Sequence, residues 1–181
     1  ERILTLDEEK VLLDSSPSHL KPVLITALNT GMRYGELLNL TWSDVEFDSG
    51  YIHVRQSKSG KSRKIPMNET VRETLLELES ENFVSNSVSS DSIREEKTSS
   101  YQIVTQDTRC LEGAVPVMAC GFDSRLRHHE SSTPVFIHNG KPIKSLRTAF
   151  ENSCNRANLK SVSFHTLRHT FATRLVLSGI D

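Results

Sequence analysis

The feature that most constrains the fold of this chain is a stretch of 52 residues, 81–132, that carries no regular hydrophobic pattern. Eight of the 21 residues from Ser80 to Ser100 are serine. The rest of the stretch follows neither the helical period of about 3.6 residues nor the two-residue period of a strand. Connections of that length are uncommon inside a compact domain. We therefore expect a mobile insertion, in which Tyr101–Thr105 could form a short strand, that divides the chain into residues 1–80 and 133–181.

The net charge of the chain, −1, is the sum of two unlike parts. The stretch 81–132 holds five basic and eight acidic residues, whereas the other 129 residues hold 17 basic and 15 acidic residues. A near-neutral chain argues against a strongly basic nucleic-acid-binding protein. That argument weakens here, because the patterned part of the chain has a net charge of +2 and its cations are concentrated in one segment.

Apolar runs and cysteines exclude two other classes of protein. No apolar run approaches the roughly 18 residues of a membrane-spanning helix, so we expect no membrane span. Cys110, Cys120 and Cys154 are odd in number and lack the spacing of metal ligands. We therefore expect no disulfide framework, and a reducing compartment. The first residue is Glu1 and no signal-peptide pattern follows it, so we expect a segment of a longer protein.

The patterned parts predict a mainly α fold with a small antiparallel β-sheet, an α+β architecture. A capping box formed by Thr5 and Glu8 starts the first helix, and Gly31 follows the second helix where a terminal glycine is typical. Asp48-Ser49-Gly50 joins two strands as a hairpin. The expected helices cover residues 6–13, 18–29, 34–39, 69–78, 145–158 and 166–177, and the expected strands cover 45–47, 51–54, 63–66 and 134–137.

Two sets of residues are expected in the core. Trp42 lies beside a leucine cluster, which favours burial. The last expected helix carries apolar residues along one face, which predicts a buried stripe. This stripe comprises Phe164, Leu167, Phe171, Leu175 and Val176.

Arg33 lies between the glycine that ends one helix and the start of the next, in the sequence Thr30-Gly31-Met32-Arg33-Tyr34-Gly35-Glu36. Glu36, one turn later, can hold the Arg33 side chain while its guanidinium group points outward. A guanidinium group matches two phosphate oxygens at once. Taken alone, the pattern fits a surface ion pair better than a phosphate site, and such a pair contributes only about 0–1 kcal/mol.

A cluster of cations, with no acid among them, lies in and beside the polar turn, Ser57 to Ser62, that joins the second expected strand to the third. Its five members are Arg55, Lys58, Lys61, Arg63 and Lys64. Such a turn can contact a polyanion, although a solvated hairpin tip explains it equally well. Ser59-Gly60-Lys61-Ser62 resembles the end of a nucleotide-binding loop, but that motif requires glycine at position 55, where this chain has arginine. We therefore exclude a nucleotide-binding loop.

His165 and Arg168 are three residues apart at the start of the last expected helix. This spacing puts both side chains on one face, and anions are favoured at a helix N-terminus. The alternative is a capping histidine beside a surface arginine. His165 and His169 have the spacing of two helical zinc ligands, but the glutamate of that motif and a third ligand are missing, so we predict no metal site.

In this order, these residues resemble the catalytic domain of the tyrosine recombinases, the phage-integrase family. Thr30–Leu37 looks like the first arginine motif of the family, and His165–Thr173 looks like its His-x-x-Arg motif. Gln56–Gly60 falls in the hairpin turn where the family carries a lysine. The match covers residues 2–79 and 133–181. One His-x-x-Arg alone would carry no weight, whereas two long motifs in the right order form a specific signal.

The resemblance implies a reaction on double-stranded DNA. In this family a tyrosine attacks a phosphodiester and forms a 3′-phosphotyrosyl link, which the 5′-hydroxyl of a partner strand then attacks. Because the bond energy is kept, the resemblance implies no ATP, metal or other cofactor. It also implies that full-length protomers assemble on DNA as a synaptic tetramer, in the cytoplasm of a bacterium or of a phage-infected cell.

The resemblance also implies a role for each site residue. Arg33 and Arg168 would bind the non-bridging oxygens, and His165 would add a hydrogen bond. Lys58 would protonate the departing 5′ oxygen, with Lys61 as the alternative for that role. The residues expected to contact neighbouring phosphates are Lys61, Arg63 and Lys64.

The nucleophile of the family has no counterpart at the expected place. Family members carry it beyond the His-x-x-Arg motif, after a further helix, whereas this chain ends at Asp181 and its tyrosines are Tyr34, Tyr51 and Tyr101. We therefore expect the chain to supply phosphate-activating residues without cleaving DNA by itself. The alternative hypothesis is a catalytically inactive, integrase-derived module that binds DNA or protein.

Overall fold

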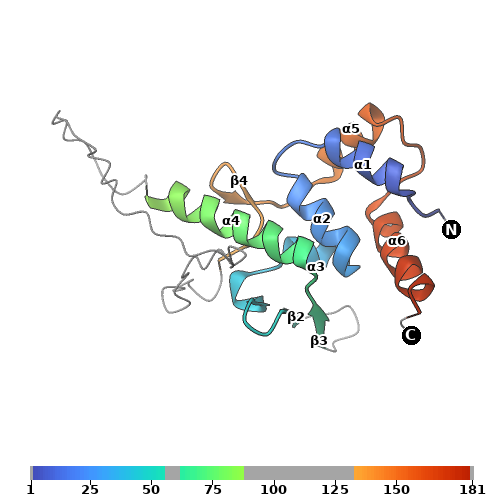
Figure 1. The fold of residues 1–181 in the computed structure, drawn as a ribbon. Helices are drawn as coiled ribbons and strands as arrows, with labels where there is room; N and C mark the ends of the chain where they lie inside the picture. Colours follow the sequence, from blue (N-terminus) through green and yellow to red (C-terminus); the bar gives the residue numbers. More distant parts are fainter. Residues whose placement is uncertain (1, 56–61, 88–132, 180–181) are drawn as a thin grey trace, which may run out of the picture.

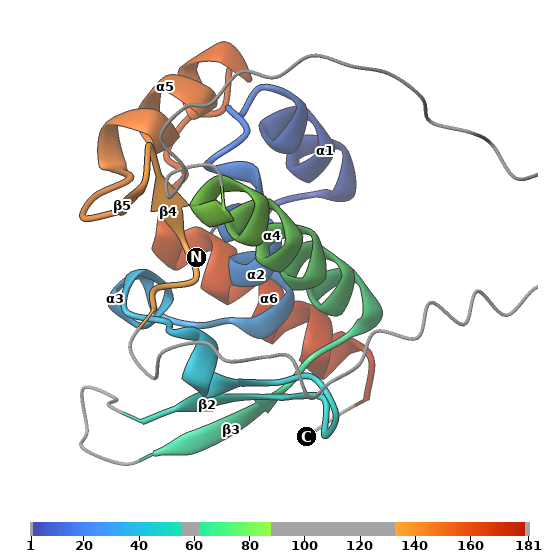
Figure 2. The ribbon, with the colours of Figure 1, turned by 90° about the vertical axis from the view of Figure 1, so that its left-hand side faces the viewer.

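The structure is a computed structural model that describes residues 2–55, 62–87 and 133–179 (Figure 1). Lys58, Lys61 and the possible strand at Tyr101–Thr105 lie outside these ranges. Within them, the chain forms six α-helices, a three-stranded antiparallel sheet at one edge of the helices (Figure 2) and a small hairpin. The predicted mainly α fold with a small antiparallel sheet is therefore confirmed. None of the described helices is both long enough and apolar enough to cross a membrane.

The N-terminal helices begin and end at the residues that their caps select. Helix α1, Leu6–Asp14, starts at the predicted capping box, in which the Glu8 N–H donates to the Thr5 hydroxyl at 3.2 Å. Helix α2, Lys21–Thr30, starts three residues later than predicted, because residues 17–20 form a turn with Leu20 N–H donating to the Pro17 carbonyl. It ends at Gly31, as predicted.

Helix α2 is the centre of the fold. Its side chains are buried nearly all round, as in a helix surrounded by other elements. It packs against α4, Glu69–Ser87, on one side and α6, Phe164–Leu177, on the other, as Figure 2 shows. Apolar residues from both sides of residues 88–132 join it in one cluster, which includes Leu12, Leu24, Leu37, Leu75, Leu146 and Leu167.

The three-stranded sheet follows the short helix α3, Tyr34–Leu38, and a single 3-10 turn, Trp42–Asp44. Strands β1, Val45–Glu46, and β2, Tyr51–Val54, form the predicted hairpin, and Gly50 in its turn has a φ of 71°. Strand β3, Arg63–Pro66, pairs with β2 so that Ile52 faces Ile65. Trp42 is buried, as predicted.

Helix α4 is longer than the sequence pattern predicts. Asn68 caps it as expected, by accepting a hydrogen bond from the Val71 N–H at 3.0 Å. The helix continues to Ser87, nine residues beyond the predicted end at Leu78, because no Gly or Pro interrupts residues 69–87. The first seven residues of the stretch 81–132 are therefore helical.

The second part of the chain begins with a hairpin that was only half predicted. Pro134 forms an isolated bridge with Thr41, and strand β4 covers Ile137–His138 rather than 134–137. Strand β5, Lys141–Pro142, was missed. It pairs with β4 across Asn139-Gly140, whose φ values of 51° and 71° suit a tight hairpin turn.

Two helices complete the described chain. Helix α5 covers Arg147–Arg156, and α6 begins at Phe164, two residues earlier than predicted, with Ser163 as its cap. The buried stripe predicted along α6 is wrong at its end: Leu175 and Val176 are exposed, at 37% and 67%. The reason is that the last turn of α6 extends beyond α2, its main packing partner (Figure 1).

Candidate phosphate-binding site

Arg33 is the residue immediately before helix α3, where the chain is extended with φ −73° and ψ 151°. Its N–H donates to Glu36 Oε2 at 2.8 Å, and its Nη1 donates to Glu36 Oε1 at 3.1 Å. The Glu36 side chain is only 5% exposed, whereas that of Arg33 is 45% exposed. The predicted contact between the two residues is therefore present, and it holds an otherwise accessible guanidinium group.

Arg63, on strand β3, binds the same carboxylate from the other side. Its Nη1 lies 3.0 Å from Glu36 Oε1 and its Nη2 lies 2.6 Å from Glu36 Oε2, a two-point ion pair between residues 27 positions apart. Burial alone would raise the pKa of Glu36, but hydrogen bonds from Arg63 and Arg33, with the charge of Arg63, lower that pKa to about 2. Glu36 therefore stays ionised and ties the sheet to α3.

Arg168 reaches this cluster from helix α6. Its Nη1 donates to the carbonyl oxygen of Gly31, at the end of α2. Burial lowers the pKa of Arg168, the positive charges of Arg33 and Arg63 lower it further, and Glu36 opposes them. Three guanidinium groups thus lie within electrostatic range of one carboxylate. An oxyanion beside them would relieve the repulsion, which favours anion binding.

Gly31 permits the close approach of α6 to the end of α2. Its φ of 59° lies in the left-handed region that glycine adopts most readily. A Cβ atom at this position would overlap the ring of Phe171, on the turn of α6 that follows Arg168. The short distance between the two helices that brings Arg168 to Arg33 therefore depends on the absence of a side chain.

His165 lies in the first turn of α6 and is exposed. Its Nε2 is 2.7 Å from the Nε2 of His169, one turn later. Phe164, which precedes His165, packs against Tyr34, which follows Arg33: the centroids of the two rings are 4.6 Å apart. The Tyr34 hydroxyl also accepts a hydrogen bond from the Leu146 N–H at 2.7 Å. The residues next to Arg33 and His165 therefore pack together.

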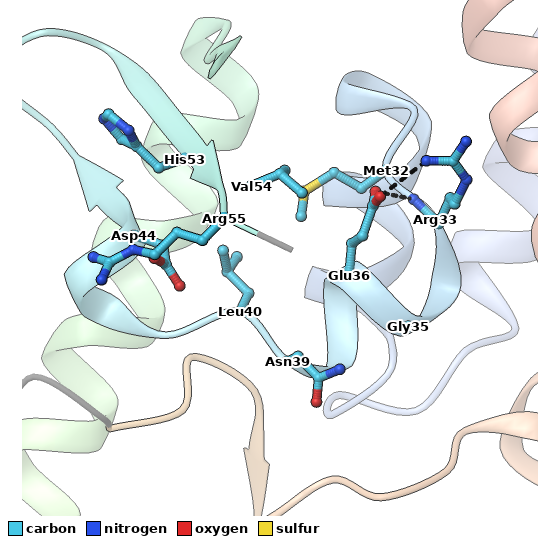
Figure 3. Close-up of a pocket in the computed structure, with 10 residues that line it drawn as sticks. All are labelled: Met32, Arg33, Gly35, Glu36, Asn39, Leu40, Asp44, His53, Val54 and Arg55. Atoms are coloured by element: carbon cyan, nitrogen blue, oxygen red, sulfur yellow. Dashed lines mark hydrogen bonds and ion pairs between the residues drawn. The ribbon is translucent and has the colours of Figure 1, made fainter. Parts of the chain in front are cut away.

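A hollow of about 550 Å³ opens beside Arg33, between α3 and the β1–β2 hairpin (Figure 3). Glu36 and Met32 lie on the α3 side, where Figure 3 draws the contacts between Glu36 and Arg33. On the hairpin side, Arg55 Nε lies 2.5 Å from Asp44 Oδ1. The hollow is thus lined by charged groups on both sides, and two of its lining residues, Arg33 and Glu36, also belong to the arginine cluster.

The structure brings together some of the predicted site residues and leaves others apart. Arg33, Arg63 and Arg168 share one cluster, and His165 lies one turn before Arg168 on α6. Lys64 points away from Glu36, since successive strand residues face opposite sides, and its Nζ lies 6.0 Å from the centre of the Tyr51 ring. The placement of Lys58 and Lys61 lies outside the described residues.

Sequence reasoning missed two contacts of the site. The Arg63–Glu36 ion pair joins two elements and has no local sequence signal. The His165–His169 contact follows from the spacing of four residues, but the sequence suggested it only as a metal pair. Among the residues that the structure describes, no three His, Cys, Asp or Glu side chains gather into a group that could hold a metal ion.

The sequence matches the model of the phage integrase family over residues 1–181. The chain belongs to the phage integrase family. It is 29% identical over 181 residues to the tyrosine recombinase XerA of Pyrococcus furiosus, covering 98% of this chain and 49% of that protein. It is 25% identical over 185 residues to the integrase of Salmonella phage P22, covering 99% of this chain and 38% of that protein.

Solved structures share the fold of this integrase-family chain. The crystal structure of XerA recombinase has a TM-score of 0.61 at 23% identity, over 100% of this chain and 51% of that one. A lambda integrase dimer bound to a core site has a TM-score of 0.57 at 21% identity, over 96% of this chain and 52% of that one. The chain therefore spans about half the length of the relatives it matches.

Proposed function

We propose that this chain forms part of the catalytic domain of a site-specific DNA recombinase, and that its arginine cluster binds the phosphate at which the DNA strand is broken. The observation that carries the proposal is the arrangement of Arg33, just before α3, and Arg168, on α6, whose guanidinium groups lie within electrostatic range. Membership of the phage integrase family supports the reaction class. The Tn1549 transposon integrase, a structural neighbour in complex with circular intermediate DNA, supports the DNA substrate.

In this proposal the arginines stabilise the charge that develops on the reacting phosphate. Arg33 and Arg168 each donate to a non-bridging oxygen as the phosphorus becomes five-coordinate, which lowers the barrier most where donors are already in position. His165, one turn before Arg168, donates a further hydrogen bond and can assist proton transfer. Like-charge repulsion among the guanidinium groups in the free protein favours the anion-bound state.

The lysines complete the proposed chemistry. Lys58 gives a proton to the departing 5′ oxygen, and Lys61 is the alternative donor. Lys61 and Lys64 contact phosphates next to the reacting one. Arg63, which the sequence also predicted to contact a neighbouring phosphate, has both its Nη atoms on Glu36.

The proposed nucleophile is a tyrosine that none of the described tyrosines provides. Tyr34 packs against Phe164, and its hydroxyl accepts a hydrogen bond from the Leu146 N–H. Tyr51 lies on β2, on the face away from Glu36. We therefore propose that this chain alone does not cleave and rejoin DNA. Incubation with supercoiled plasmid tests this: topology should stay unchanged, and relaxation by the chain alone would contradict the proposal. Full-length protomers are proposed to assemble on DNA as a synaptic tetramer.

The phosphate site itself can be tested by titration with orthovanadate at constant ionic strength. Arg33→Ala should weaken vanadate binding at least about tenfold, since a charge-assisted hydrogen bond contributes roughly 1.5–3 kcal/mol. Arg156→Ala is the matched control, because Arg156, in the last turn of α5, donates to the Ser15 carbonyl at the end of α1 and has no contact with Glu36 among the described residues. Equal affinity of wild type and Arg33→Ala would reject the proposed oxyanion site. Binding of duplex DNA without activity in the full-length protein would favour the inactive DNA-binding module instead.

A further inference from the structure

The carboxylate of Glu36 has no acceptor position left for a further donor. A carboxylate offers about four acceptor positions, two on each oxygen. Oε1 accepts from Nη1 of both Arg33 and Arg63, and Oε2 accepts from the Arg33 N–H and from Arg63 Nη2. All four positions are therefore occupied, and Arg63 fills one of the two on each oxygen.

The two arginines use this carboxylate in different ways. Arg63 forms a two-point pair through its guanidinium group, at 3.0 and 2.6 Å, which is the strongest geometry for such a contact. Arg33 makes only one guanidinium contact, at 3.1 Å, and its second contact comes from the backbone. Consistent with this difference, the Arg63 side chain is 32% exposed and the Arg33 side chain is 45% exposed.

The absence of Arg63 would change what Arg33 can do. Each Glu36 oxygen would regain one acceptor position, and Arg33, three residues away in sequence, would be the nearest cation in contact with it. A second guanidinium N–H of Arg33 could then donate to Glu36 and complete a two-point ion pair. The carboxylate in that pair would be the Glu36 side chain, which is only 5% exposed. A guanidinium group in such a pair has fewer donors and less net charge to offer a phosphate.

We propose that Arg63 is a positioning residue for the phosphate site: by filling one acceptor position on each Glu36 oxygen, it keeps Arg33 from closing onto Glu36 and leaves the Arg33 guanidinium group free to bind a phosphate oxygen. This inference rests on the proposed phosphate binding by Arg33. It assigns Arg63 an action through Glu36 and Arg33 rather than a contact with neighbouring phosphates. Lys64, next to it on β3, faces the other side of the strand and cannot replace it.

The position of Arg63 also links two parts of the site. Arg63 is the first residue of β3, paired with Val54 at the end of β2. Its ion pair with Glu36 connects the start of β3 to α3. Arg33 is the residue immediately before α3. Arg63 can reach Glu36 only when β3 lies against α3. The proposed freedom of the Arg33 guanidinium group therefore depends on the folded position of the sheet.

The test measures orthovanadate affinity, at constant ionic strength, for variants of the chain whose folding is checked by thermal unfolding. Arg63→Ala should raise the Kd about tenfold, the equivalent of one charge-assisted hydrogen bond of Arg33. Arg63→Lys keeps the charge but not the two-point geometry, and should fall between Arg63→Ala and wild type. The decisive variant is Arg63→Ala with Glu36→Gln.

The double variant separates positioning from a direct contact. A glutamine at position 36 can still accept the Arg33 N–H through its amide oxygen, but it has no charge with which to draw in the guanidinium group. The double variant should therefore recover the affinity to within about threefold of wild type, a difference that corresponds to about 0.7 kcal/mol. Arg174→Ala, which removes an Arg–Glu pair between α6 and α1, is the matched control and should leave the Kd unchanged.

Each outcome bears on one claim. If Arg33→Ala binds vanadate as tightly as wild type, the proposed phosphate site is rejected. If Arg33→Ala loses binding but Arg63→Ala keeps wild-type affinity, the role of Arg63 is rejected alone. If Arg63→Ala loses affinity and Glu36→Gln does not restore it, Arg63 contacts the anion directly and the positioning role is wrong. Should Arg63→Ala fail to fold, Arg63→Lys with and without Glu36→Gln provides the same comparison.

Discussion

Glu36 is the residue on which the charges of the site depend. Its buried carboxylate binds two arginines from different parts of the chain, Arg33 just before α3 and Arg63 on β3. Breaking one partner of a buried pair usually leaves the other charge uncompensated, which costs more than the pair itself contributes. The stability of the fold and the charge of the site are therefore coupled at this one side chain.

The first prediction concerns the pH dependence that Glu36 confers. Its pKa is about 2 in the folded protein against an ordinary value of 4.5, so its stabilising effect is complete above about pH 4.5 and is lost as the pH falls toward 2. The shift corresponds to stability on the order of 3 kcal/mol. Urea unfolding at pH 7, 4 and 3 should show the stability difference between wild type and Glu36→Gln shrinking with acidity. Glu73→Gln, on the exposed face of α4, is the control, and a difference that stays constant would contradict the assignment.

The second prediction concerns Gly31. Gly31→Ala should destabilise the fold by about 1–3 kcal/mol, because alanine is strained at a positive φ and its Cβ would overlap the Phe171 ring. Gly35→Ala is the matched control: a Cβ there meets nothing within 4 Å, and alanine favours the helix. Urea unfolding of both variants tests the pair. Equal stabilities of the two variants would show that the approach of α6 to α2 does not depend on Gly31.

At this scale, the sequence predicted contacts that are local and missed those that cross elements. The spacing of Arg33 and Glu36 predicted their contact, because the residue just before a helix lies beside the third residue of that helix. The Arg63–Glu36 pair depends on the position of β3 against α3, which no spacing encodes. Resemblance to a family located Arg33 and Arg168, but it did not give the partner that each guanidinium group has in this chain.

Helix α6 carries two of the proposed site residues, and its first turn is held by Ser163. The Ser163 hydroxyl accepts from the Thr166 N–H at 3.3 Å, and the Ser163 N–H donates to the Thr166 hydroxyl at 3.1 Å. This reciprocal pair fixes the turn on which His165 lies. The cap therefore contributes both to helix stability and to the position of His165 relative to Arg168.

The third prediction follows from this cap. Ser163→Ala should reduce the free energy of unfolding by about 1 kcal/mol, the usual cost of losing a cap side chain. Ser163→Asp should recover most of that loss, because aspartate also accepts from the first turn and its charge suits a helix N-terminus. Thermal or urea unfolding of both variants gives the comparison. A Ser163→Asp variant no more stable than Ser163→Ala would argue that the cap contributes little.

At the scale of elements, start signals were more informative than stop signals. The caps at Thr5 and Asn68 were predicted and are present. The end of α4 was missed by nine residues, since no Gly or Pro marks it. The Asn139-Gly140 turn is a strong hairpin signal that predicts β4 and β5 once it is recognised.

The whole molecule is built around α2, with partners drawn from both sides of residues 88–132. The N-terminal segment is tied to α6 twice: the Leu4 N–H donates to the Thr170 hydroxyl at 2.9 Å, and Arg174 pairs with Glu9 at 2.5 Å. The bridge between Thr41 and Pro134 joins the two parts again. These contacts, and the shared core, join described residues that lie on both sides of 88–132.

The fourth prediction tests whether that stretch is needed for the fold. Residues 89–131 are replaced by a flexible Gly/Ser linker of about 20 residues, which can reach up to roughly 65 Å. Because the core is shared by residues on both sides, we expect a melting temperature within a few degrees of wild type, and the same vanadate affinity. Leu75→Ala combined with the linker is the control that should unfold, since Leu75 is fully buried. A linker variant that loses cooperative unfolding would mean that part of 89–131 belongs to the core, and the division into two parts around an insertion would be wrong.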